Sequence, residues 1–188
     1  MPTSNFSISR ARQAPVMVKL ESTYGTDPTP AAGTDDLLTY SSEIVWGPQI
    51  SRIEFRPHGT SFTRGLDVIA ARLATVNFRT WLCGSGTRGS TAVNGYRSLT
   101  AALQAAGMTE TVSASTSITH APAAVSGMKS VTIWANHAGQ VHKVNGAIGN
   151  VRMSGNPRTG LECQFSFTGL YVAPVAVSTT FRSEEHTS

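Results

Sequence analysis

Two runs of alternating residues, Ala147–Met153 and Leu161–Thr168, constrain the fold of this chain more than any other feature of its sequence. In both runs apolar residues alternate with polar or small ones, which is the period of a β-strand with one buried face. The segment between them, Ser154–Gly160, is rich in Gly, Asn and Pro and predicts a turn. Together the two runs predict a β-hairpin that has an apolar face and a polar face.

The spacing of the runs predicts a register in which Met153 lies opposite Leu161. On the apolar face this register pairs small residues with large ones: Val151 with Cys163, Gly149 with Phe165 and Ala147 with Phe167. On the polar face it pairs Arg152 with Glu162 and Asn150 with Gln164. A cross-strand ion pair contributes roughly 0.2–1 kcal/mol and helps to fix the alignment. The functional question is what the polar face contacts.

Similar patterns predict further strands along the chain. They cover Val16–Leu20, Leu37–Tyr40, Glu43–Trp46, Val68–Leu82, one strand near Ile118, Val131–Trp134 and Gln140–Val144. The last two form a second hairpin with Trp134 opposite Val141. Loops are predicted over Gly47–Gly65, which is partly extended, and over the glycine-rich Gly84–Gly95.

One helix is predicted over Ser98–Ala106, because Leu99 and Leu103 share a face, Ser98 can cap its start and Gly107 can end it. The elements as a whole predict a mainly β fold, a β-sandwich or barrel of antiparallel strands with one flanking α-helix.

The chain has 188 residues, of which 14% are charged, and its formal net charge is +4. This length suffices for one domain with a substantial core, and the mild basicity is below that of dedicated nucleic-acid binders. Residues 1–14 are polar and predict an N-terminal arm ahead of a β domain over residues 15–181. Cys83 and Cys163 lie in predicted strands, and we expect two buried thiols in preference to a disulfide.

The last seven residues, Arg182–Ser188, look like the translation of a common sequencing adapter, AGA-TCG-GAA-GAG-CAC-ACG-TCT, read in one frame. We expect residues 182–188 to be a tail of that origin and leave them out of the fold. Phe181 is then the last natural residue, and the β domain is incomplete at its C-terminus. A natural polar tail is the alternative.

The sequence contains no catalytic, cofactor-binding or metal-binding constellation, and we expect no enzyme. Gly84–Gly89 matches GxGxxG, but the predicted helix begins too late for a dinucleotide site, which favours a flexible loop. His137 and His142 have no carboxylate or cysteine nearby in sequence, and the adjacent Asp35 and Asp36 lack the alternating ligands of a calcium loop.

The segment Glu21–Pro28 resembles the opening of tail tube proteins of long-tailed (siphovirus-type) bacteriophages. The helix Leu99–Ala106 with the following Gly107-Met108 is also similar to that family. So are Ser130–Trp134, Gly139–His142, Gly146–Met153 and Phe165–Pro174. These landmarks span most of residues 16–174, and family members are often longer, which agrees with a truncation after Phe181.

The resemblance implies a structural virion protein, the major tail tube subunit. Copies made in the bacterial cytoplasm would join their sheets into a ring, commonly hexameric, and the rings would stack into a hollow tube that conducts phage DNA into the host. The partners would be other copies and the tape measure, tail terminator and distal tail proteins, with only transient passage of DNA and no membrane contact.

We expect the polar hairpin face to be neutral to acidic, with Arg152 matched by Glu162. This charge suits the lumen of such a tube, because a lining dense in Lys and Arg would retain the phosphates of DNA. The candidate lumen-facing residues are Asn150, Arg152, Glu162, Gln164, Ser166 and Thr168. The candidates for contacts between rings come from the N-terminal arm and the segment Gly47–Gly65, namely Arg10, Arg12, Arg52, Phe55, Arg56, His58 and Arg64.

Two other classes stay open. One is a tail terminator or head–tail connector, which would form a single ring without stacking. The other is a soluble β-sandwich that binds a ligand, such as a carbohydrate-binding module. That class requires Trp46, Trp81 and Trp134 to be exposed together.

Overall fold

The computed structural model describes residues 16–37, 39, 45–54, 67–91, 96–137, 140–156, 158 and 160–176. Within them the chain is mainly β with one α-helix, as the sequence predicts. The strands are β1 (Val16–Leu20), β2 (Asp36–Leu37), β3 (Val45–Glu54), β4 (Asp67–Trp81), β5 (Met108–Ser113), β6 (Ser117–Pro122), β7 (Val131–His137), β8 (Gln140–Asn156) and β9 (Gly160–Ala176). The helix α1 spans Tyr96–Ala105, and a short 3-10 turn, η2, covers Val125–Gly127.

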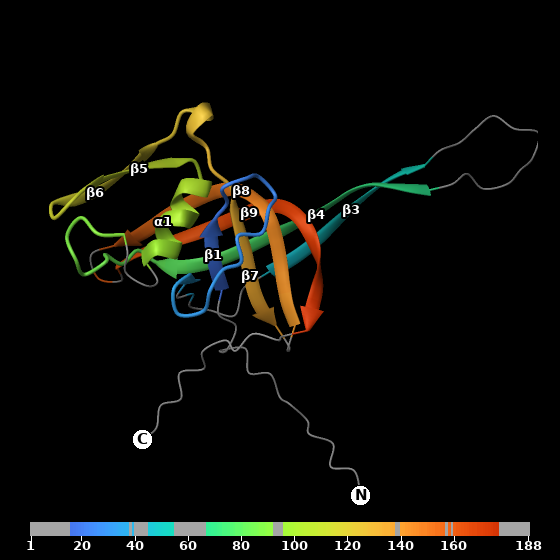
Figure 1. The fold of residues 1–188 in the computed structure, drawn as a ribbon, viewed down its shortest axis with the longest axis horizontal. Coiled ribbons are helices and arrows are strands. Elements are labelled where there is room, and N and C mark those ends of the chain that lie inside the picture. The colour runs from blue at the N-terminus through green and yellow to red at the C-terminus, as the bar shows by residue number, and fades with distance from the viewer. Residues whose placement is uncertain are drawn as a thin grey trace, which may run out of the picture.

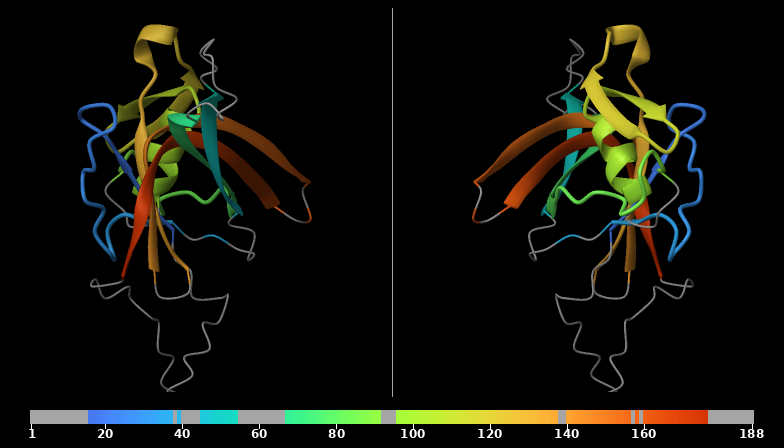
Figure 2. Two further views of the ribbon diagram at one scale, coloured as in Figure 1. Left: turned by 90° about the vertical axis from the view of Figure 1, so that its right-hand side faces the viewer. Right: turned by 90° about the vertical axis from the view of Figure 1, so that its left-hand side faces the viewer.

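Seven strands form one antiparallel sheet in the order β2-β1-β7-β8-β9-β4-β3, and β5 and β6 form a separate hairpin. The long strand β8 joins two parts of the sheet, because residues 140–147 pair with β7 and residues 148–156 pair only with β9. Irregular pairing between Asn145 and Ile148 marks the bend between these parts. The sheet therefore curves, with α1 on its inner side (Figures 1 and 2).

The core lies between the inner side of the sheet and α1. Phe78, Phe165 and Phe167 are fully buried there, with ring centroids 5.3–5.7 Å apart. Leu99 and Leu103 of α1 belong to the same cluster, as their helical spacing predicts. No helix among the described residues is long and apolar enough to span a membrane.

The predicted hairpin of β8 and β9 forms, but its predicted register is wrong by two residues. Met153 lies opposite Cys163, not Leu161, and Gly149 lies opposite Phe167, not Phe165. Pairing continues as far as Asn156, so the turn is shorter than predicted. Since a shift of two residues keeps each side chain on its face, the predicted apolar and polar faces are confirmed.

The same shift corrects the polar pairs of this hairpin. Arg152 lies opposite Gln164 and Asn150 lies opposite Ser166. The remaining apolar pairs shift as well, so Val151 lies opposite Phe165, and the predicted pairing of Ala147 with Phe167 is wrong. The chain keeps pairing because Ser154, Gly155 and Asn156 can all adopt strand geometry, and Gly155 leaves room for the backbone of Gly160.

The second predicted hairpin also has a shorter turn, because Trp134 lies opposite Lys143, not Val141. The helix begins at Tyr96, so Ser98 is a buried residue inside it and does not cap it. Gly107 has a φ of +88° and ends the helix as predicted.

Three further expectations are corrected. Residues 47–54 belong to strand β3, and residues 108–122 form two strands where one was predicted. Two predicted strands lie partly outside the described residues. Of Leu37–Tyr40, Leu37 belongs to β2 and Thr39 forms a bridge with Thr80; of Glu43–Trp46, Val45 and Trp46 belong to β3. Both cysteines are free, but Cys83 is exposed and only Cys163 is buried. Burial, together with the nearby Glu162 charge, raises the pKa of the Cys163 thiol.

Candidate functional site

The outward face of strands β8, β9 and β4 consists mainly of polar side chains. Its cross-strand rows run from β8 through β9 to β4. The rows are Ile148–Thr168–Thr75, Asn150–Ser166–Asn77, Arg152–Gln164–Arg79 and Ser154–Glu162–Trp81. All six predicted lumen residues lie in these rows, and all are exposed except Glu162, which is partly buried.

The charge on this face differs from the prediction. Glu162 pairs with Arg79 of β4, with 3.6 Å between Nε and Oε1, and not with Arg152. The predicted charge of this face counted Arg152 and Glu162 but not Arg79 of β4. With two arginines and one glutamate in the rows, the face carries a net charge of +1 and is otherwise formed by uncharged groups. It is therefore sparsely charged and slightly basic, where the sequence predicted a neutral to acidic surface.

Both edges of this four-stranded layer are open in the described part of the chain. Strand β3 ends the sheet on one side. On the other side β7 stops pairing at Ala147, so the segment of β8 from Ile148 to Asn156 has β9 on one side only. Open edges present unpaired backbone groups that readily accept a further strand.

The ribbon formed by β3 and β4 protrudes beyond the other strands, and we call residues 50–54 and 67–72 the arm (Figure 1). Ile50, Ile53, Val68 and Ile69 of the arm are 45–57% exposed. A two-stranded ribbon is marginally stable alone in water, and clustered exposed apolar side chains typically mark an interaction site. The arm therefore has the properties of a surface that contacts another molecule.

Among the predicted inter-ring residues, the structure describes only Arg52, which is exposed on the arm. The others, Arg10, Arg12, Phe55, Arg56, His58 and Arg64, lie outside the described residues.

The segment Glu21–Pro28, part of the family resemblance, anchors the bend of β8. The Glu21 carboxylate accepts hydrogen bonds from the backbone N–H groups of Gly25 (2.8 Å) and Gly146 (2.7 Å). It also accepts from the hydroxyls of Ser130 (2.7 Å) and Thr132 (2.6 Å). Sequence reasoning missed this role, because three of the four donors come from two segments more than a hundred residues away.

These hydrogen bonds stabilise Glu21 as an anion. Burial alone raises the pKa of its carboxyl group, but the donors from Gly146, Thr132, Ser130 and Gly25 together outweigh burial. The pKa of Glu21 is therefore lowered from the ordinary value of 4.5.

Farther along the same segment, Asp27 is 3.2 Å from the Lys143 ammonium group, which lies 3.7 Å from the centre of the Trp134 ring. These contacts fix the segment to the outer side of β7 and β8.

The tryptophans do not form one exposed aromatic platform. Trp134 is 7% exposed and packs with Met17 and Val141, whereas Trp81 is 39% exposed on the polar face. The side chain of Trp46 lies outside the described residues. The arrangement expected of a carbohydrate-binding module, with all three exposed together, is therefore not formed.

No protein-family model matches the chain, and no curated protein matches it. The features of the described residues that bear on function are therefore the sparsely charged polar face, the two open edges of the layer and the protruding arm.

Proposed function

We propose that this chain is a major tail tube subunit of a long-tailed bacteriophage, whose copies form stacked rings with the polar face toward the bore. One observation carries the proposal: within the described residues, the four-stranded layer β8-β9-β4-β3 is apolar on its covered side, polar on its other side and open at both edges. A layer with these three properties can close through neighbouring copies into a polar-lined barrel.

The strand directions allow this closure. Neighbouring strands of the layer are antiparallel, so β8 and β3 at its two ends run in opposite directions. When the β3 edge of one copy meets the β8 edge of the next, the new pair is again antiparallel. Repeating this head-to-tail contact gives a ring in which no edge is left open.

The resulting ring is wide enough for a conduit. Four strands spaced about 4.8 Å apart and tilted by about 40° occupy about 25 Å of circumference. About six copies then give a circumference of about 150 Å and a backbone-to-backbone diameter of about 48 Å. Side chains narrow this opening, yet it still exceeds the width of a DNA duplex.

The chemistry of the polar face is suited to the passage of DNA and not to its retention. Each phosphate neutralised by a cation releases condensed counterions and strengthens DNA binding. The two arginines of the face are partly offset by Glu162, and hydroxyl and amide groups form most of the remaining rows. We therefore expect weak, sequence-independent contact with DNA.

Arg52, an exposed residue of the arm, remains our candidate for contacts between copies in successive rings. Tape measure, terminator and distal tail proteins are the further partners that this function requires.

Electron microscopy of the purified chain at high concentration tests the assembly. Stacked rings are the expected result. Single rings would favour the terminator or connector alternative, and persistent monomers would contradict the proposal and favour a soluble ligand-binding domain.

Cysteine accessibility tests which face lines the bore. In a Cys83→Ser background, Ser166→Cys places a thiol on the polar face, and Thr111→Cys places a matched one on the exposed side of β5. A maleimide attached to a large polymer should modify both thiols in monomers but only Thr111→Cys in tubes. Equal modification of Ser166→Cys in tubes would refute the assignment of the lumen.

A further inference from the structure

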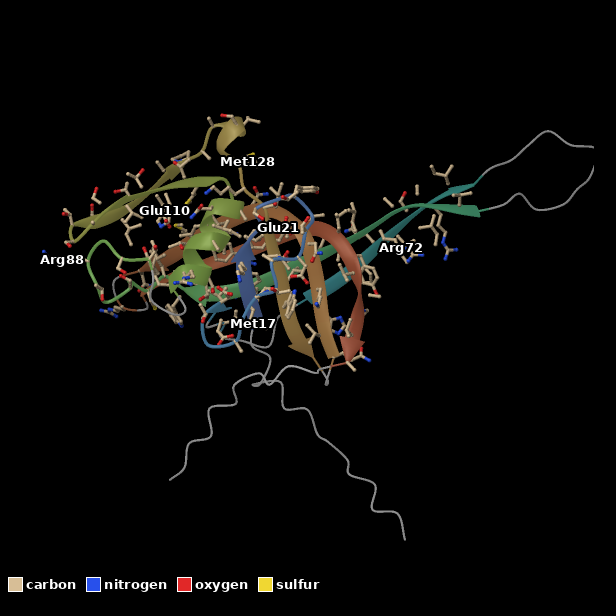
Figure 3. All side chains as sticks on the ribbon, viewed as in Figure 1. Met17, Glu21, Arg72, Arg88, Glu110 and Met128 are labelled. Carbon is tan, nitrogen blue, oxygen red and sulfur yellow. The ribbon has the colours of Figure 1, made fainter. Side chains whose placement is uncertain are left out.

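A depression of about 400 Å³ lies beside the bend of β8, at the start of its open edge. It is lined by Leu20, Glu21, Ser22, Tyr24, Met128, Lys129, Ser130 and Ile148. In Figure 3, Glu21 and Met128 lie near this bend, far from Arg72 on the arm. We propose that the depression is the docking site for the part of the arm that carries Ile53 and Val68, supplied by the neighbouring copy in the same ring. This inference rests on the proposed function.

The pairing of β7 and β8 places the depression at the end of the open edge. The two strands pair from Val131 and Ala147 onward, so residues 128–130 approach β7 beside the point where the β8 edge opens, at Ile148. A strand that is added along residues 148–156 and continues past Ile148 must cross these residues. The depression lies in the path of that strand.

Strand β3 is long enough to follow this path. Within one copy, Gly47 shares a cross-strand row with Ile148, through Thr75 and Thr168. The seven residues from Pro48 to Glu54 therefore extend beyond the row of Ile148. Barrel tilt displaces a neighbouring copy along the strands by about five residues in one direction or the other. Only the displacement toward Asn156 keeps β3 paired along residues 148–156, and the overhang exceeds that displacement by about two residues. Ile53 and Glu54 then pass the neighbour's Ile148.

The two surfaces also match chemically. Leu20, Tyr24, Met128 and Ile148 supply apolar groups to the depression, and Tyr24 and Met128 are 62% and 45% exposed. The Glu21 carboxylate at its wall already has its four donors and requires no cation from an occupant.

The arm offers a complementary convex surface. Ile50 is 52% exposed, and Ile53 and Val68, which lie opposite each other, are 57% and 56% exposed. Docking would remove apolar surface of both copies from water.

Disulfide crosslinking tests the contact. In the Cys83→Ser background, Ile53→Cys on the arm is combined with Met128→Cys at the depression, and the assembled protein is oxidised. Because each copy would be linked to the next, we expect a ladder of covalent oligomers on a non-reducing gel. The matched control combines Ile53→Cys with Thr111→Cys on β5, and it should yield no ladder.

The outcomes separate this inference from the proposed function. Rings or tubes that give no ladder overturn the docking site alone, and protein that stays monomeric overturns both proposals. A ladder that forms equally in the Thr111→Cys control would show non-specific contact and also overturn the site.

As an independent check, Met128→Asp should leave the circular dichroism of the monomer unchanged and raise the protein concentration needed for assembly about tenfold. An unchanged assembly concentration would contradict the inference.

Discussion

Two parts of strand β4 share one backbone ladder but differ in what covers them. From Ala74 to Thr80 every second side chain is buried beneath α1 and the neighbouring strands, whereas the residues from Val68 to Arg72 are all exposed. Apolar side chains occur in both parts. The comparison shows that strand pattern sets the faces of a sheet, while the presence of a covering layer decides which face becomes core.

The largest expected effect contrasts a core residue with an arm residue. Phe165→Ala removes a fully buried ring that contacts Phe78 and Phe167 and should cost about 3–5 kcal/mol of unfolding free energy. Ile69→Ala on the arm should change the stability of the monomer by less than about 0.5 kcal/mol. Urea unfolding of both variants measures the difference. Equal losses would show that the arm is packed within the monomer.

The next effect concerns the anchor of the bend. Glu21→Gln replaces an anionic acceptor by an amide whose NH₂ group faces donors, and it should cost about 2 kcal/mol at neutral pH. Since the folded pKa of Glu21 is lowered, its contribution is complete above the ordinary value of 4.5 and is lost as the pH falls through the folded pKa.

Chemical unfolding of wild type and Glu21→Gln between pH 7 and pH 2 tests this. The stability gap should be constant down to about pH 5 and then narrow. A gap that widens in acid would refute the assigned role of the carboxylate.

The last comparison distinguishes two glycines. A Cβ at Gly149 would overlap the carbonyl oxygen of Ser166 and lie 2.8 Å from the Cα of Phe167, so Gly149→Ala should cost about 1–3 kcal/mol. Gly84 has no atom within 4 Å of the same position, and Gly84→Ala should be nearly neutral. Thermal unfolding of the pair provides the test, and similar melting temperatures would contradict the close packing of β8 on β9.

Part of the candidate site follows directly from the sequence. Alternation placed Asn150, Gln164 and Ser166 on one polar face, and an error of two residues in register left that assignment intact. The sequence did not predict that residues of β4 belong to the same face. Arg79 lies far from Glu162 in sequence, and no local pattern indicates that β4 pairs with β9.

The sequence by itself determined the mainly β class, the helix with its buried leucines, and which side chains of β8 and β9 face the core, because these depend on local periodicity. Only the tertiary structure decided the strand order, the bend anchored by Glu21, the two open edges and the exposure of the arm. These depend on contacts between segments more than a hundred residues apart in some cases, such as Glu21 with Thr132 and Gly146. Such contacts are determined by the packing of the whole chain, and no periodic pattern in the sequence indicates them.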